Sequence, residues 1–210
     1  MEMKKIKPEV RYLHDIKKVL YDKEWAKNAP NFELYYIYRG LKTKNSIRYD
    51  ITLIPARMLG EEFVKTKGHY HLGSYGELYK ILASESIFLI QKKGVKDVYF
   101  VKAKKGEYIL IPPQYGHTII NPSSKTEFPS PEKGTKVKKR TKSSSPLKIA
   151  NWVSKDCQSD YKSIERKRGF CYYYTLTGWI KNKNYKRIPK LKQKRPFKSF
   201  PKNLNFLYGN

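Results

Sequence analysis

The chain has 210 residues, which is enough for one domain of ordinary size with its own hydrophobic core. No apolar run approaches the roughly 20 residues that span a bilayer, and residues 1–7 lack the apolar stretch of a signal peptide. The two cysteines, Cys157 and Cys171, form neither a CxxC motif nor an even framework of four or six. We therefore expect a cytoplasmic protein with reduced thiols and no membrane span.

The formal net charge of +27 raises the question of a nucleic-acid partner, because lysine and arginine neutralise phosphates. The lysines are spread along the whole chain, which favours a compositional bias over a dedicated nucleic-acid surface. Nucleic-acid binding stays an alternative. Lysine near a pocket would also attract an anionic metabolite such as a sugar phosphate.

Most of the chain is predicted to form short β-strands separated by turn residues. Residues 1–31 are expected to be an N-terminal extension with one short helix around Asp15–Trp25. Strands are then predicted at Glu33–Arg39, Ile47–Ile54, Lys67–His71, Glu77–Leu82, Ile87–Gln91, Asp97–Lys102, Tyr108–Ile111, His117–Asn121, Lys148–Val153 and Cys171–Leu176. Many short strands with almost no helical periodicity predict an all-β sandwich or barrel over residues 32–180.

Two basic segments depart from this pattern. Residues 122–146 hold few apolar side chains and cannot offset their ordering entropy by burial, so we expect a mobile basic loop inserted between two core strands. Residues 181–210 form a basic C-terminal tail in which Pro189, Pro196 and Pro201 exclude a long helix. The aromatic side chains of this tail either dock on the barrel or stay free.

Three of the four histidines occur in one arrangement. His69 and His71 flank Tyr70, Glu77 follows, and His117 comes much later, after a Pro-Pro turn. Side chains alternate along a strand, so His69 and His71 should point the same way. Three imidazoles and one carboxylate suit a borderline divalent metal such as Fe, Ni, Mn or Zn.

The motifs around these residues resemble those of the cupin-type phosphoglucose isomerases of archaea and some bacteria. The first motif is Thr-Lys-Gly-His-Tyr-His at 66–71 with Gly-Glu-Leu-Tyr at 76–79, and the second is Gly-Glu-Tyr-Ile-Leu-Ile-Pro-Pro at 106–113 with Tyr-Gly-His at 115–117. Asn121, the stretch at 150–153 and Asp160-Tyr161 agree as well. The resemblance covers roughly residues 10–121 and 147–180. It departs at 83–86, which lack the glycines of many members, and at Ser159, where some relatives carry histidine.

The resemblance implies a cupin barrel, a homodimer, and the interconversion of glucose 6-phosphate and fructose 6-phosphate. His69, His71, Glu77 and His117 would bind one divalent metal, with Fe²⁺ preferred and Ni²⁺, Mn²⁺ or Zn²⁺ as alternatives. Glu77 is the candidate catalytic base. If Glu77 also binds the metal, its basicity falls and a hydride shift is favoured over proton transfer through an enediol. The sequence leaves both routes open.

The same resemblance indicates substrate-binding residues. Thr66, Lys67 and Gly68 are the candidate phosphate contacts, because a threonine hydroxyl and closely approaching backbone N–H groups both suit an anion. Thr52 is a second candidate threonine for the phosphate. Tyr79 shares the face of Glu77 and should point into the barrel towards the substrate, and Tyr161 is a further candidate.

Two other classes of function compete with the isomerase. One is another cupin reaction on a sugar phosphate, such as epimerisation or mannose 6-phosphate isomerisation. The other is a non-catalytic cupin that binds a ligand or nucleic acid through its basic loop and tail. Competition between phosphorylated hexoses separates the first from the isomerase, and salt-sensitive binding of DNA or RNA would indicate the second.

Overall fold

The computed structural model describes residues 6–123 and 145–209. Within these ranges the chain is mostly β-structure, and most of the predicted 122–146 insertion lies outside the described residues. The strands are β1 (Glu9–Tyr12), β2 (Glu33–Lys44), β3 (Ile47–Ile54), β4 (Met58–Leu59), β5 (Glu62–Phe63), β6 (Tyr70–His71), β7 (Glu77–Ala83), β8 (Glu85–Lys92), β9 (Val98–Lys104), β10 (Tyr108–Ile111), β11 (Tyr115–Ile120), β12 (Leu147–Ser154), β13 (Ser159–Asp160), β14 (Tyr172–Thr175), β15 (Gly178–Lys181) and β16 (Lys192–Lys194).

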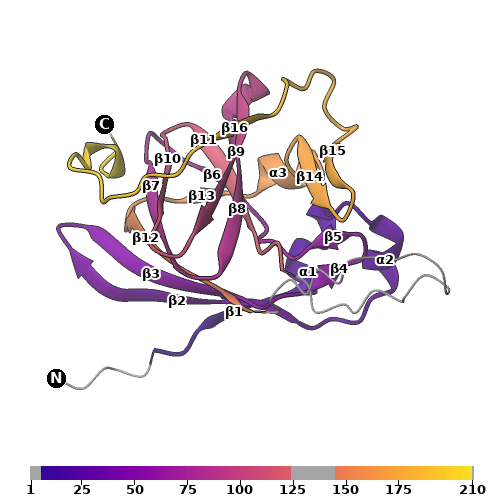
Figure 1. Cartoon of the computed structure of the whole chain (residues 1–210), viewed down its shortest axis with the longest axis horizontal. Helices are drawn as coiled ribbons and strands as arrows, with labels where there is room; N and C mark the ends of the chain where they lie inside the picture. Colours follow the sequence, from indigo (N-terminus) through magenta and orange to yellow (C-terminus); the bar gives the residue numbers. More distant parts are fainter. Residues whose placement is uncertain (1–5, 124–144, 210) are drawn as a thin grey trace, which may run out of the picture.

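Two larger sheets enclose the core. The first has six strands in the order β1-β2-β3-β12-β7-β10, and the second has four in the order β11-β8-β9-β16. Every pairing in them is antiparallel except that of β16 with β9. Apolar side chains of both sheets meet in one cluster that includes Ile81, Ile149, Phe88, Ile90 and Ile119. Figure 1 shows these sheets curving around a common interior, the all-β cupin barrel that the sequence predicts.

The hairpin at residues 33–54 is longer than expected. Glu33–Arg39 continues through Gly40 to Lys44, and the turn consists of Asn45 and Ser46, both with positive φ. Two such residues form the turn type that matches the twist of paired strands. The hairpin projects beyond the barrel in Figure 1.

The expected helix around Asp15–Trp25 is wrong in detail, because the region forms three short pieces. These are α1 (Leu13–Ile16), the 3₁₀ turn η1 (Lys17–Val19) and α2 (Lys23–Asn28). Leu20 is extended, and the side chain of Asp22 accepts a hydrogen bond from the Trp25 N–H and so begins a new helix. Leu13, Ile16, Val19 and Leu20 are fully buried, so core packing interrupts a continuous helix.

The predicted strand Lys67–His71 is also shorter than expected. Regular pairing is limited to β6, with single bridges at Lys65 and His69. Gly68 has a φ of 75°, and a Cβ there would lie 2.8 Å from the carbonyl oxygen of His117. This left-handed backbone interrupts the ladder just before the first histidine.

Smaller elements complete the described part of the chain. A four-stranded sheet, β15-β14-β5-β4, lies beside the barrel, and β13 pairs with β6. The remaining helical turns are η2 (Lys93–Val95), α3 (Lys162–Arg166) and η3 (Asn205–Leu207). No helix among the described residues is long and apolar enough to cross a membrane.

A buried ion pair joins the N-terminal segment to the barrel. Lys65 Nζ lies 2.5 Å from Glu62 Oε1 and donates to the Val19 carbonyl at 2.9 Å, while the Tyr21 N–H donates to Glu62 Oε2 at 2.9 Å. Both charged side chains are almost fully buried. Burial raises the pKa of Glu62, although Lys65 opposes that shift.

Replacing Lys65 with methionine should therefore destabilise the fold by about 3–5 kcal/mol at neutral pH, because the Glu62 carboxylate is left buried without its partner. The loss should shrink at acidic pH, since Glu62, whose pKa burial raises, then takes up a proton in the folded state. Urea unfolding at neutral and at acidic pH measures this. The double variant Glu62→Gln/Lys65→Met should recover part of the stability, and a pH-independent loss would contradict the assignment.

Candidate metal centre

The backbone pairing of His69 with His117 is the foundation of the site. The His69 N–H donates to the His117 carbonyl at 3.2 Å, and the His117 N–H donates to the His69 carbonyl at 3.0 Å. Residues directly opposite each other in an antiparallel pair project their side chains to the same face. The two imidazole rings accordingly lie 4.8 Å apart between centroids.

His71 joins them from the same segment, as the alternation rule predicts. The intervening Tyr70 points the other way, into the core, where its hydroxyl accepts from Gln91 Nε2 at 2.5 Å. His71 Nδ1 lies 3.0 Å from the Tyr75 carbonyl oxygen. Because a carbonyl can only accept, Nδ1 carries the proton and Nε2 is directed into the cluster.

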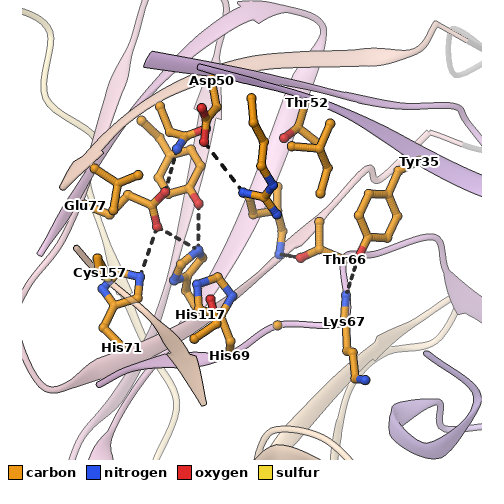
Figure 2. A pocket seen from close by; sticks show the side chains of 18 of the residues that line it. Tyr35, Asp50, Thr52, Thr66, Lys67, His69, His71, Glu77, His117 and Cys157 are labelled. Atoms are coloured by element: carbon orange, nitrogen blue, oxygen red, sulfur yellow. Dashed lines mark hydrogen bonds and ion pairs between the residues drawn. The ribbon is translucent and has the colours of Figure 1, made fainter. Parts of the chain in front are cut away.

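Glu77 supplies a carboxylate at the start of β7. Its Oε2 lies 3.2 Å from His71 Nε2 and 3.5 Å from His117 Nε2, while its Oε1 accepts from Asn151 Nδ2 at 2.7 Å. One ligand atom from each of His69, His71, Glu77 and His117 lies within 4.8 Å of all the others. The fold thus brings together all four residues that the sequence nominated, as Figure 2 shows.

The protonation states differ within the cluster. Burial lowers the pKa of His69 and of His117 well below the usual value, and neighbouring imidazoles lower both further. Burial also acts to lower the pKa of His71, but its contacts with Cys157 and Glu77 outweigh that effect and raise it to about 10. At neutral pH two imidazoles are neutral, and His71 is an imidazolium that faces the Glu77 carboxylate.

The cluster fits a divalent metal. His71 Nε2, Glu77 Oε2 and His117 Nδ1 are buried without a hydrogen-bond partner among the described residues, although buried polar atoms are almost always paired. Imidazole nitrogens and a carboxylate are ligands for Fe, Ni, Mn or Zn. A metal would coordinate these atoms, two of which, His71 Nε2 and Glu77 Oε2, otherwise have only each other at 3.2 Å.

Tyr79 lies on the face predicted for it. Its ring is buried, and its hydroxyl is 2.8 Å from His117 Nε2. Burial raises the pKa of Tyr79 well above its usual value, and the nearby Glu77 carboxylate raises it further. Tyr79 therefore keeps its phenolic proton at physiological pH.

The other nominated residues line the same pocket: Thr52, Thr66, Lys67, Gly68 and Tyr161. The Tyr161 ring lies 5.6 Å from the His69 ring. Lys67 has a local partner, because its Nζ is 2.5 Å from Glu165 Oε1 and stands over the Tyr161 ring. Its charge is partly neutralised before any anion binds.

Sequence reasoning missed three arginines of the pocket. Arg11, Arg39 and Arg48 line it, and Arg48 Nε donates to both oxygens of the buried Asp50 at 2.9 Å. Arg39 bonds Glu9 at 2.7 Å and approaches the same aspartate at 3.7 Å. An arginine and an aspartate two apart in a strand share one face, and this pattern was the available signal.

Two further lining residues received no role from the sequence. Asn151 holds Glu77 Oε1 from β12, and an asparagine inside a strand of apolar residues was the signal for it. Ser159, where some relatives carry histidine, pairs across from His71 in β13 and lines the pocket. The pocket therefore presents a hydroxyl at that position instead of an imidazole.

Comparison with known proteins gives one family. The family model described as "Glucose-6-phosphate isomerase (GPI)" matches residues 10–127. The glucose-6-phosphate isomerase of Thermococcus litoralis is 29% identical over 126 residues, which cover 57% of this chain and 65% of that protein. The chain thus spans slightly less than two thirds of the length of this curated relative.

Solved structures are similar at lower identity. Peruvianin-I, a cysteine peptidase from Thevetia peruviana latex, matches with a TM-score of 0.43 and 10% identity, over 69% of this chain and 77% of that one. Oxalate decarboxylase from Bacillus subtilis matches with a TM-score of 0.39 and 13% identity, over 60% of this chain and 27% of that one.

The family match begins in β1 and includes all four residues of the cluster. It extends over more than half of the 210 residues. The chain therefore belongs to the glucose-6-phosphate isomerase (GPI) family.

Proposed function

We propose that this protein is a metal-dependent glucose-6-phosphate isomerase that interconverts glucose 6-phosphate and fructose 6-phosphate. The observation that carries the proposal is the convergence of three imidazoles and Glu77 at one polar pocket in a chain of this family. A homodimer and a cytoplasmic location stay predictions.

His69, His71, Glu77 and His117 would hold the metal, with Fe²⁺ preferred. When bound, a divalent metal supplies Lewis-acid stabilisation of negative charge on the substrate oxygens. His71 is already oriented for this by its bond to the Tyr75 carbonyl. His69 and His117 are neutral, as ligands must be, because burial lowers their pKa.

Glu77 is the proposed proton carrier. Asn151 holds one carboxylate oxygen at 2.7 Å and leaves the other directed at the histidines, which is a suitable place for a base that moves a proton between C1 and C2. Because Glu77 is also one of the four proposed ligands, a bound metal would lower its basicity, and a hydride shift is then the favoured route. Retention or loss of deuterium from C2-labelled glucose 6-phosphate distinguishes these routes.

Among the proposed phosphate-binding residues, Thr66 has the clearest local support as a hydrogen-bond donor to the phosphate. Its Oγ1 accepts from the Ile119 N–H at 3.0 Å, and the hydroxyl of Thr118 is already committed to the Thr66 carbonyl at 2.8 Å. The contact between the two hydroxyls is long, at 3.4 Å. A phosphate oxygen would therefore offer the Thr66 proton a better acceptor.

The arginines favour an anionic substrate. Arg11, Arg39 and Arg48 bond two carboxylates, Glu9 and Asp50, so this group of side chains keeps an excess of positive charge. Thr52 lies in the same strand as Arg48 and is buried beside the pocket.

The first test is turnover. Protein treated with a chelator should not convert fructose 6-phosphate to glucose 6-phosphate in a coupled assay, and added Fe²⁺, Ni²⁺ or Mn²⁺ should restore the rate. His69→Ala and His117→Ala should retain no metal and no activity, whereas His14→Ala should behave as wild type. Full activity in either cluster variant would refute the site, and faster turnover of mannose 6-phosphate would move the proposal to a related isomerase.

Metal affinity should depend on pH. Because contacts with Cys157 and Glu77 raise the pKa of His71 to about 10, the metal must displace one proton from His71 at lower pH. The apparent association constant should rise about tenfold per pH unit up to that value. Calorimetry in buffers of different ionisation enthalpy counts the released proton. An affinity that is flat between about pH 7 and about pH 9 would contradict this assignment.

Thr66→Val should raise KM for fructose 6-phosphate about tenfold or more with a smaller change in kcat, because it removes a hydrogen bond to a charged group. Thr118→Val is the matched control, since it makes the same change at a threonine that does not line the pocket and whose hydroxyl is bonded to the Thr66 carbonyl. Equal effects of the two variants on KM would remove Thr66 from the phosphate site.

A further inference from the structure

The basic tail follows a defined course that the family match does not reach. We call residues 192–209 the strap. It begins as β16, parallel to β9, and then bridges to β10. The Tyr108 N–H donates to the Phe197 carbonyl at 2.9 Å, and the Phe197 N–H donates to the Tyr108 carbonyl at 2.8 Å. Figure 1 shows this yellow segment crossing the outside of the barrel from β9 towards β7 and β10.

The far end of the strap reaches the loop between two proposed ligands. This loop, Leu72–Gly76, connects His71 to Glu77. The Gly76 N–H donates to the Phe206 carbonyl at 2.6 Å, and a Cβ on Gly76 would lie only 2.7 Å from the Phe206 ring. Gly209 packs on the ring of Tyr75. The strap and the loop are therefore in direct contact, through a backbone hydrogen bond and through the packing of two aromatic rings.

One buried side chain anchors this contact. Leu207, in η3, is fully buried in a small cluster with Leu78 and Tyr108. Leu78 directly follows Glu77 in β7. Phe200, earlier in the strap, packs instead on Tyr108 and Trp152, with ring centroids 5.8 and 5.4 Å away.

The loop itself has little packing of its own. Leu72 is 45% exposed, and Gly73 is exposed with a φ of 78°. Yet its Tyr75 carbonyl is the acceptor that orients His71. A carbonyl in a mobile loop would leave the imidazole free to rotate, so whatever restrains Tyr75 also restrains His71.

We infer that the strap is a positioning element for the metal centre, in which Phe206, Leu207 and Gly209 hold the Tyr75 carbonyl against His71. The expected effect of the strap on metal binding rests on the proposed metal site, whereas the positioning of His71 does not require a metal. It gives the basic tail a function in the chemistry of the barrel.

The test compares Leu207→Asp with Phe200→Ala in the full chain. In metal-free protein labelled with ¹⁵N-histidine, the His71 Nδ1–H should give an exchange-protected NMR signal, which Leu207→Asp should broaden or abolish. The same variant should weaken the binding of Co²⁺, measured against a chelator, about tenfold, as losses of outer contacts to metal ligands do, and should change the Co²⁺ absorption spectrum. Phe200→Ala should leave the NMR signal, the spectrum and the affinity as in wild type.

Gly209→Val tests the same contact without altering the buried Leu207. The added side chain would collide with the Tyr75 ring and displace the strap, and every core side chain stays in place. The variant should reproduce the loss of the NMR signal. An unchanged His71 signal in this variant, or equal changes in Phe200→Ala, would overturn the inference. Failure of wild-type protein to bind Co²⁺, with the His71 signal still lost in the strap variants, would refute the proposed metal function and leave the positioning role standing.

Discussion

The pair of backbone hydrogen bonds between His69 and His117 is the constraint on which the site depends. It joins the segment that leads into β6 to strand β11, and it places two imidazoles on one face. Gly68 makes this approach possible, because a side chain there would collide with the His117 carbonyl and with Phe170. His71 and Glu77 then follow from chain geometry, one by alternation along the strand and the other by the return of the chain into β7.

Residues outside the cluster hold its side chains in place through a chain of contacts. Asn151 restrains Glu77, the Tyr75 carbonyl restrains His71, and the strap restrains Tyr75. The support for His71 is local, four residues along the chain, whereas Asn151 and the strap come from distant parts of it. Such preorganisation matters because ligands that are already held in place lose little freedom when a metal binds.

The charges in the pocket favour an anionic substrate. Three arginines share two carboxylates there, and burial keeps the imidazoles of His69 and His117 neutral. This excess of positive charge gives a physical reason for the proposed sugar phosphate beyond the family relationship.

The sequence by itself determined the strand-rich fold, the four clustered residues and the inward direction of Tyr79, because alternation along strands and the spacing of His69, His71, Glu77 and His117 are local properties. It erred where packing competes with local preference, as in the helix around Asp15–Trp25 and the strand at Lys67–His71. Tertiary structure alone decided the partners: that Lys67 meets Glu165, that Asn151 meets Glu77, that three arginines share one pocket, and that the tail reaches Tyr75. These contacts join residues far apart in the chain, and a contact of that kind exists only once the barrel has closed.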